Sequence, residues 1–310
     1  MENNIELSIY GTRGSCATGS KEYAVFGGDT SSYALRIGDS LHFLDAGSGI
    51  RRAMLQELTP AIKEAYLHIT HGHADHIDMG CASGLYFNKI KDGIKVVGYK
   101  DVSRALKNFF SGDTLWPVPV KDMKGLNPDI TQLQGGETLE YPAYKVKTLQ
   151  NYHPLKHDDV NSGFGGSIGF KFEIPDGEKL VRIAYVTDME FDYLPGCKVQ
   201  PQAARLKKEF VNFVQDADVL LADTHFINDE YERTMPFVRG WGHSTLERII
   251  DLANEAGVKK LLGTHHAPAR TDEILKRLEG YAVDYAKSTG FRGEFQFARD
   301  GDRYDFGGGK

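Results

Sequence analysis

The sequence predicts a mixed α/β fold, and two observations lead to that prediction. Short apolar runs of strand length alternate along the chain with longer segments whose apolar residues recur at helical spacing. Side chains that bind metals stand directly after several strand-like runs, which is typical of α/β folds because the ends of their strands meet at one sheet edge. Since no linker, low-complexity tract or internal repeat interrupts the sequence, we expect one domain over residues 1–310.

The first part of the chain is expected to form strands joined by glycine-rich turns. The strands should lie at 7–10, 33–37, 41–45 and 65–69, and a helix at 50–58. Glycine-rich turns at 11–15 and 27–32 can bring backbone N–H groups near an anion. Gly27, Gly28 and Thr30 are therefore candidate substrate contacts.

Asp45 ends one of these strands beside small residues, and its position has two interpretations. A carboxylate there can accept a hydrogen bond from the outer nitrogen of a metal-bound histidine. The same carboxylate can also cap the helix that we expect at 50–58. The residues themselves leave both interpretations open.

The rest of the chain continues the alternation of strands and helices. Strands are expected at 94–99, 144–149, 167–172, 180–186, 217–222, 260–264 and 294–297, and helices at 79–87, 101–110, 202–214, 240–256 and 272–287. Asp101 is the expected cap of its helix, and Gly257 should end the helix before it. Prolines exclude a regular element from 115–120, which we place on a loop near the mouth of the site.

The composition excludes several classes of protein. No window is long and apolar enough to span a membrane, and the first seven residues do not resemble a signal peptide, so we expect a cytoplasmic protein. Cys16, Cys81 and Cys197 lack metal-binding or redox spacing and are interpreted as buried thiols. A net charge of −6 does not give the basic surface that a binder of long nucleic acid needs, although it permits a small phosphorylated substrate.

The stretch 71–76 is the richest in metal-binding side chains. It reads H-x-H-x-D-H and contributes His71, His73, Asp75 and His76 directly after a strand-like run. An extended backbone places the first two histidines on one face, and a turn at the last two residues can offer a second set of donors. Because the chain has only 11 histidines, this spacing is a specific signal, and it indicates two adjacent metal ions.

Three later strand ends carry further donors, at His153, Asp188 and His265. Imidazole and carboxylate ligands suit zinc, with manganese or iron as alternatives. We assign His71, His73 and His153 to one ion and Asp75, His76 and His265 to the other, with Asp188 bridging the two. His266 directly follows His265, so the sequence leaves open which of them is the ligand, and His266 is also a candidate substrate contact.

This ordered set of residues resembles the metallo-β-lactamase fold superfamily over most of the chain, which implies a four-layer αββα sandwich. The resemblance is closer to its phosphodiesterase branch, the ribonuclease Z-like enzymes and the related cyclic-nucleotide phosphodiesterases. It rests on the G-H-S-T sequence at 242–245, the segment 254–262 and the T-H pair at 264–265. In that branch the first motif supplies a catalytic histidine and the second a metal ligand, which implies these roles for His243 and His265.

One departure from the family concerns the size of the substrate. Ribonuclease Z carries a long basic arm between its counterparts of His153 and Asp188, whereas only 35 positions separate them here. We therefore expect a small phosphodiester as the substrate, a cyclic nucleotide for example, and we do not expect long nucleic acid as a partner. Related enzymes are commonly dimers, so a homodimer is one expected state.

The sequence thus leads to a mechanistic hypothesis. Asp75 positions a hydroxide that bridges two divalent ions, and His243 acts as the general acid that protonates the leaving oxygen. The alternatives are a hydrolase of another ester, such as a thioesterase or lactonase, whose leaving group needs no such acid, or a ribonuclease Z-like nuclease. The physiological substrate, the native metal and the oligomeric state are not determined by the sequence.

Overall fold

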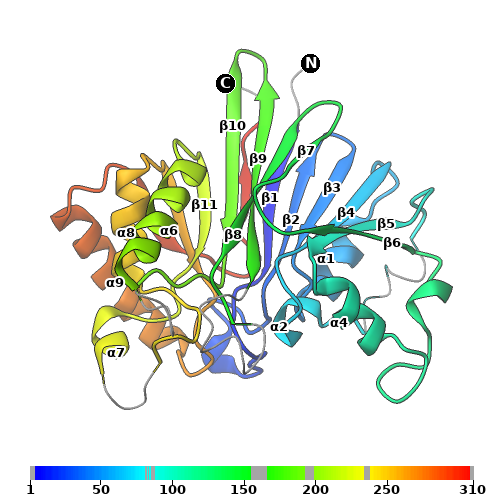
Figure 1. Cartoon of the computed structure of the whole chain (residues 1–310), viewed down its shortest axis with the longest axis horizontal. Helices are drawn as coiled ribbons and strands as arrows, with labels where there is room; N and C mark the ends of the chain where they lie inside the picture. Colours follow the sequence, from blue (N-terminus) through cyan, green and yellow to red (C-terminus); the bar gives the residue numbers. More distant parts are fainter. Residues whose placement is uncertain are drawn as a thin grey trace. The chain divides into compact units, whose positions relative to one another are not determined.

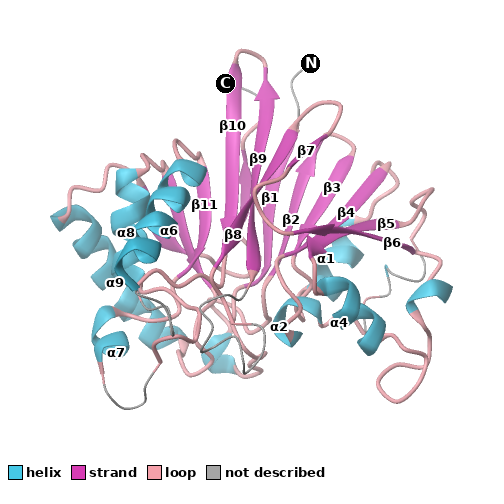
Figure 2. Cartoon of the chain, in the orientation of Figure 1, coloured by secondary structure: helices cyan, strands magenta, loops and turns pink. Residues whose placement is uncertain are grey.

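The computed structural model describes residues 4–80, 82, 84, 88–154, 166–192, 199–233 and 238–307. Contacts divide the chain into two compact units, which we call unit 1 (Met1–Leu133 with Arg299–Lys310) and unit 2 (Gln134–Ala298). Within the described residues each unit has one seven-stranded sheet with helices beside it (Figure 2). The predicted α/β class is confirmed, whereas the single domain spanning 1–310 stays a prediction.

Unit 1 has a sheet with the strand order β14-β1-β2-β3-β4-β5-β6 (Figure 1). Its strands are β1 (Ile5–Gly11), β2 (Ser32–Ile37), β3 (Ser40–Leu44), β4 (Glu64–Ile69), β5 (Ile94–Tyr99), β6 (Leu126–Leu133) and β14 (Arg303–Asp305). Its helices are α1 (Ile50–Glu57), α2 (Ala74–Ile77) and α4 (Val102–Phe109), with 3-10 turns at Lys21–Tyr23 and Val120–Asp122. Helix α1 contacts β1 to β3, and α4 contacts β5 and β6.

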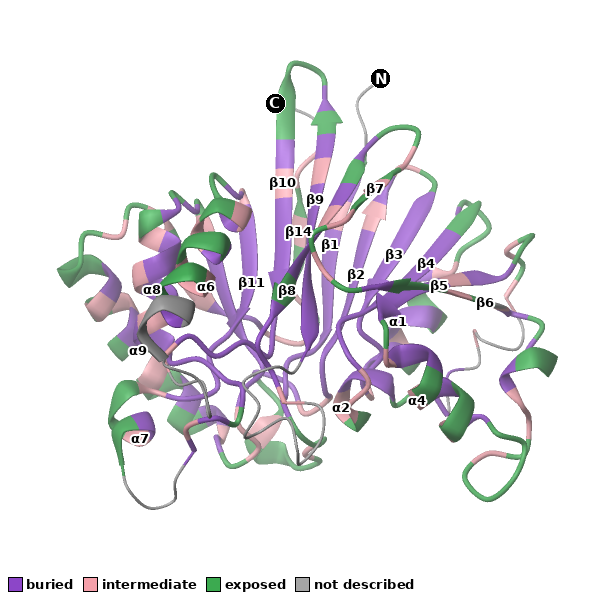
Figure 3. Cartoon of the chain, in the orientation of Figure 1, coloured by how far each residue is buried: buried purple, intermediate pink, exposed green. Residues whose placement is uncertain are grey.

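The parallel pair β3 and β4 explains how unit 1 positions its functional residues. Both strands are largely apolar runs whose residues are almost all buried (Figure 3), as expected for parallel strands covered on both faces. Leu44 lies opposite His68 in this pair. The next amide, that of Asp45, donates to the His68 carbonyl at 2.8 Å. Asp45 and the loop that follows β4 therefore leave the same edge of the sheet.

Unit 2 has a sheet with the order β13-β12-β11-β10-β9-β8-β7. Its strands are β7 (Thr138–Glu140), β8 (Lys145–Asn151), β9 (Ser167–Asp176), β10 (Lys179–Val186), β11 (Val219–Asp223), β12 (Lys260–Thr264) and β13 (Glu294–Phe297). Its helices are α6 (Val199–Val214), α7 (Asn228–Glu232), α8 (Leu246–Glu255) and α9 (Asp272–Ser288). Because β10, β11 and β12 are parallel and in register, the residues that follow them emerge side by side.

Several expectations need correction. Strands β6, β7 and β14 were not predicted. Strand β6 contains Pro128, whereas β7 and β14 are only three residues long and are formed by pairing with β8 and β1. Helix α8 begins at Leu246 rather than near 240, with Thr245 as its N-cap. The helix expected at 79–87 lies mostly outside the described residues. No helix in the described part of the chain has the length and apolar character that crossing a bilayer requires.

Three single-residue expectations also change. Asp45 does not cap α1, whose N-cap is Gly49. Asp101 occupies the N-cap position of α4, but its side chain accepts a hydrogen bond from the Gly72 amide at 3.2 Å instead of capping the helix. Cys16 is an exposed thiol rather than a buried one, while Cys81 and Cys197 lie outside the described residues.

Candidate metal centre

Unit 1 gathers its four predicted ligands on the loop and short helix that follow β4. The His71 Nε2 and His73 Nδ1 atoms lie 2.9 Å apart, and Asp75 Oδ2 lies 3.4 Å from His76 Nε2. Two ligand atoms at 2.0–2.1 Å from a tetrahedral zinc ion stand about 3.3 Å apart. Both pairs that the sequence assigned to a common ion therefore have a spacing near the one that such an ion requires.

Asp45 and Thr70 hold the outer nitrogens of two of these histidines. Asp45 Oδ2 lies 2.6 Å from His76 Nδ1, and the Thr70 amide donates to Asp45 Oδ1 at 2.7 Å. The Thr70 hydroxyl lies 2.9 Å from Asp45 Oδ2 and 3.0 Å from His71 Nδ1. Because the carboxylate can only accept, the threonine hydroxyl donates to it and accepts from His71. Both imidazoles are thus held with Nδ1 protonated and Nε2 able to bind a metal.

Ser15 provides a contact to Asp75 that the sequence analysis missed. Its backbone amide donates to Asp75 Oδ2 at 2.7 Å, and its φ of 63° lies in the left-handed region. Such a backbone conformation costs about 1–3 kcal/mol and persists where surrounding contacts enforce it. The first glycine-rich turn therefore does present an N–H group to an anion, although the anion in this structure is a carboxylate of the protein.

Unit 2 brings His153, Asp188 and His265 together from three strand ends. Asp188 Oδ1 lies 3.7 Å from His153 Nε2, and Asp188 Oδ2 lies 3.4 Å from His265 Nε2. All three side chains are almost completely buried. One carboxylate thus directs its two oxygens toward two different imidazoles, which is the arrangement that a bridging ligand of two metal ions requires.

Left-handed backbone recurs at these strand ends. Asp188 has a φ of 53° and His265 a φ of 59°, as Asp45 in unit 1 has a φ of 56°. Asp188 is held there because its carbonyl accepts from Ser167 Oγ at 2.9 Å and its Oδ2 accepts from Thr187 Oγ1 at 2.8 Å. Non-glycine residues in this region cluster at functional sites, so the strain itself marks these positions.

Gly242 connects the predicted ligand His153 with the loop that carries His243. Its carbonyl lies 3.1 Å from His153 Nδ1, which it can hold in the protonated state and so leave Nε2 for a metal. Gly242 has a φ of 86°, and a Cβ at this position would lie 2.2 Å from His153 Nδ1. Only glycine fits here, because any side chain would displace the imidazole.

His243 is paired with Asp223, a partner that the sequence analysis did not identify. His243 Nδ1 lies 2.8 Å from Asp223 Oδ2, and both side chains are buried. Because the carboxylate can only accept, Nδ1 carries the proton and Nε2 is the nitrogen left for chemistry. His243 lies on the loop before α8 rather than at the helix start, and Asp223 is the last residue of β11.

His225 stacks on the ring of His243, with centroids 4.5 Å apart and planes 16° apart. Burial, reinforced by the neighbouring His243, lowers the pKa of His225 well below its usual value, so this imidazole is neutral at pH 7. Its Nδ1 lies 3.0 Å from the His265 carbonyl oxygen. The donor atoms of four residues lie within 4.8 Å of one another: Asp223, His225, His243 and His265.

These four residues form a hydrogen-bonded support more readily than a metal site. The Nδ1 atoms of His225 and His243 already face oxygen acceptors of the protein. Nearly parallel stacked rings direct their in-plane lone pairs alongside one another, so they do not converge on one ion. The cluster is therefore better suited to hold His243 in place than to bind a further metal.

Glu190 fixes the loop that carries His243. Its buried carboxylate accepts from the amides of Gly240 and Gly242, each at 2.8 Å, and from the Tyr231 hydroxyl. Burial raises the pKa of Glu190 to about 7, while these hydrogen bonds act in the opposite direction. The sequence analysis missed this residue because its partners are backbone amides about fifty positions away.

The four predicted substrate contacts have different surroundings in the structure. The Gly27 amide donates to the Tyr23 carbonyl at 2.9 Å, and a Cβ on Gly28 would lie 1.9 Å from the Thr18 carbonyl oxygen, so both glycines serve close packing inside unit 1. His266 is fully buried, with its ring edge-on to Phe297. The roles of Gly27, Gly28 and His266 as substrate contacts stay predictions, and His265 rather than His266 faces Asp188. Thr30 does line a pocket beside Asp75.

Comparisons with known proteins show the family to which this chain belongs. Residues 43–266 match the family model described as a beta-lactamase superfamily domain. A ribonuclease Z of Halobacterium salinarum is 27% identical over 330 aligned residues, which cover 96% of each chain.

Two solved structures also share the fold. Unliganded yeast PDE1 has a TM-score of 0.71 at 16% identity, and the metallo-beta-lactamase fold protein YhfI from Bacillus subtilis has a TM-score of 0.64 at 18% identity. In both cases 98% of this chain and 100% of the other chain are covered. The family match and the fold together establish that this chain belongs to the beta-lactamase superfamily and is a metal-dependent hydrolase of the metallo-β-lactamase fold.

Proposed function

We propose that this protein is a binuclear metal-dependent phosphodiesterase that hydrolyses a small phosphodiester, for example a cyclic nucleotide. The observation that carries this proposal is the Asp223–His243 pair, in which a carboxylate 2.8 Å away orients an imidazole. A phosphodiester with an alkoxide leaving group needs a proton donor at that oxygen. A thioester has a thiolate leaving group that departs without protonation, so thioester hydrolysis does not account for this pair. A lactone also expels an alkoxide, and the substrate panel below distinguishes it.

We propose that seven residues bind two divalent ions. The donor atoms within each unit have spacings near those of ligands that share an ion, and the outer nitrogens of His71, His76 and His153 face protein acceptors. Imidazole and carboxylate donors favour zinc. When bound, two such ions would lower the pKa of a coordinated water and neutralise phosphate oxygens. The proposed ligands are His71, His73, Asp75, His76, His153, Asp188 and His265.

The protein's own residues have separate roles in this proposal. Asp75, held by the Ser15 amide, orients the attacking water on the side opposite the leaving group. In its doubly protonated form, which the Asp223 carboxylate stabilises through Nδ1–H, His243 donates the Nε2 proton to the leaving oxygen and becomes neutral. Glu190 holds the loop so that His243 keeps its place.

A ribonuclease Z-like activity on RNA is the second candidate, and the name of the Halobacterium salinarum relative supports it. That name conflicts in part with our expectation that long nucleic acid is not a partner. The segment between His153 and Asp188 nevertheless contains four basic and five acidic residues, so it does not supply a basic arm. The cytoplasmic location and the homodimer expected from the sequence stay predictions.

The proposal is tested by offering one metal-loaded preparation a panel of substrates. The panel contains bis(p-nitrophenyl) phosphate, cyclic nucleotides, a precursor transfer RNA, a thioester and a lactone, and His73→Ala serves as the control. We expect metal-dependent cleavage of the small phosphodiesters that His73→Ala abolishes. Turnover of the thioester or lactone alone would overturn the phosphodiesterase proposal, and cleavage of the RNA alone would favour the second candidate.

A further inference from the structure

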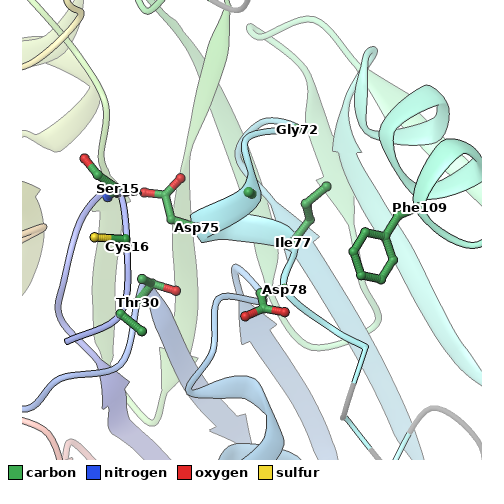
Figure 4. Close-up of a pocket in the computed structure, with 10 residues that line it drawn as sticks. Ser15, Cys16, Thr30, Gly72, Asp75, Ile77, Asp78 and Phe109 are labelled. Carbon is green, nitrogen blue, oxygen red and sulfur yellow. Dashed lines mark hydrogen bonds between the residues drawn. The ribbon is translucent and has the colours of Figure 1, made fainter. Parts of the chain in front are cut away.

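A pocket in unit 1 extends from the predicted metal ligand Asp75 to an aromatic side chain of α4. Its volume is about 340 Å³, within the range of small-ligand sites. Figure 4 shows the carboxylate of Asp75 beside Ser15 and Cys16 at one end, and the ring of Phe109 at the other. The pocket is lined by Ser15, Cys16, Ala17, Thr30, Gly72, Ala74, Asp75, Ile77, Asp78 and Phe109.

The end of the pocket away from Asp75 has the character of a stacking site. Phe109 is half-buried, and its ring stacks on that of Trp116 with planes 19° apart and centroids 6.5 Å apart. It also meets the ring of Phe110 edge to face, with centroids 4.8 Å apart. Ile77 adds a second apolar wall. A rigidly supported aromatic ring beside an aliphatic side chain favours a flat, apolar-faced ligand.

Asp78 gives the pocket a specific polar requirement. In the view of Figure 4 its exposed carboxylate lies between Thr30 and Phe109 on the pocket wall, and it can only accept hydrogen bonds when ionised. With Asp75 at the other end, the pocket holds two acidic side chains and no basic one among its lining residues. It therefore disfavours a second phosphate and favours a planar group that donates N–H hydrogen bonds.

We propose that this pocket binds the nucleobase of the substrate, with the base stacked on Phe109 and its N–H donors directed to Asp78. The proposal rests on the phosphodiesterase function proposed above and names its substrate class, a nucleotide phosphodiester bearing guanine. Guanine is the base selected because its N1–H and amino group offer two adjacent donors to one carboxylate, whereas the other common bases offer one donor group on that edge. The scissile phosphate then lies toward Asp75.

The test measures binding of guanosine to the full-length, metal-loaded protein by calorimetry. Guanosine has no phosphodiester, so its binding does not depend on hydrolysis. Phe109→Ala should weaken the binding about 5- to 150-fold, the range expected for losing one base–aromatic stack. Leu115→Ala is the matched control, because Leu115 is an exposed apolar residue of the neighbouring segment that does not line the pocket.

Asp78 is tested with a matched pair of ligands. Inosine is guanosine without the amino group, so the wild-type protein should bind inosine roughly tenfold more weakly. Asp78→Asn keeps the size of the side chain but replaces one acceptor with a donor, and it should bring the guanosine-to-inosine ratio close to one. Asp113→Asn, an exposed acidic position outside the pocket, should leave the ratio unchanged.

The outcomes separate this proposal from the proposed function. If bis(p-nitrophenyl) phosphate is hydrolysed but guanosine does not bind, or binds equally to wild type, Phe109→Ala and Asp78→Asn, the nucleobase pocket is wrong and the phosphodiesterase stands. If guanosine binds and both variants weaken it while no phosphodiester is cleaved, the pocket stands and the phosphodiesterase is wrong. A guanosine-to-inosine ratio near one in the wild type would overturn the assignment of guanine.

Discussion

The two units supply the proposed metal ligands in contrasting ways. Unit 1 provides four of them within the six positions 71–76, on one loop and one short helix. Unit 2 gathers His153, Asp188 and His265 from three strand ends spread over more than a hundred positions. A local cluster depends on one loop conformation, whereas a dispersed cluster depends on the strand register of the whole sheet. We therefore expect the same substitution to have different consequences in the two units.

The largest effect is expected from removing a ligand. His73→Ala should lower the bound metal from two ions to about one per chain, because His73 has been assigned to a single ion. Asp188→Ala should lower the content of both ions, because its two oxygens face two different imidazoles. Elemental analysis of the purified variants distinguishes these outcomes, with Asp113→Asn as a control of unchanged content. Equal metal loss in both variants would contradict the bridging role.

The next effect concerns His243. If it is the general acid, His243→Ala should slow the hydrolysis of a cyclic nucleotide by roughly two to four orders of magnitude. The metal content should stay unchanged. Hydrolysis of bis(p-nitrophenyl) phosphate should fall much less, because nitrophenolate leaves without protonation. Comparable losses on both substrates would show that His243 does not act as the acid.

A smaller effect compares the residues that support each cluster. Asp45→Asn should weaken metal binding about 10- to 100-fold, because Asp45 holds both His76 and Thr70. Glu190→Gln should instead lower kcat with little change in KM or metal affinity, because Glu190 holds the loop that carries His243. Metal titration and steady-state kinetics measured on both variants test the contrast. The contrast is contradicted if both substitutions change the same parameter, either metal affinity or kcat.

The effect expected to change activity least lies in the core of unit 1, away from the predicted ligands, and concerns stability. His42 Nδ1 lies 2.8 Å from His68 Nε2, and both rings are fully buried. Burial lowers the pKa of His68 to about 3 and that of His42 well below its usual value. In the unfolded chain both titrate near pH 6.5, so the unfolded state binds more protons below that pH.

The pair should therefore contribute its full stability above about pH 6.5 and lose it as the pH falls toward 3. The expected loss is at most about 1.4 kcal/mol per pH unit for each histidine. Urea unfolding at several pH values should show that the free energy of unfolding depends less on pH in the double variant His42→Leu, His68→Leu than in the wild type. This holds whatever the stability of the variant at pH 7. The same slope of the unfolding free energy against pH in both proteins would contradict the account. The single variant His68→Gln provides a second comparison.

The sequence predicted the parts of the molecule that depend on local pattern. The apolar run of β4 followed by H-x-H-x-D-H was recognisable because strand, loop and ligands are contiguous. Strand β14 was not recognisable, since three residues form a strand only through pairing with β1. The partners of His243 and Asp75, namely Asp223 and Ser15, were missed because those contacts arise from strand register and from a left-handed turn.

The glycine-rich turns show the limit of reasoning from residue type. Glycines at 27 and 28 suggested an anion-binding turn, but they serve close packing against neighbouring backbone and side chains. The adjacent pair His265 and His266 was ambiguous in the sequence, because two histidines in succession leave a strand in opposite directions. The left-handed backbone at His265 directs that ring to Asp188, and no propensity argument would have predicted it.

The central claim is that the seven proposed ligands bind two metal ions and that the protein hydrolyses a phosphodiester with them. The most direct test titrates the metal-free, full-length protein with zinc while the bound ions and the hydrolysis of bis(p-nitrophenyl) phosphate are measured together. We predict saturation at two ions per chain, with activity that rises as the second ion binds and weaker binding of both ions in Asp188→Ala. Full activity with one ion, or hydrolysis without bound metal, would contradict the account.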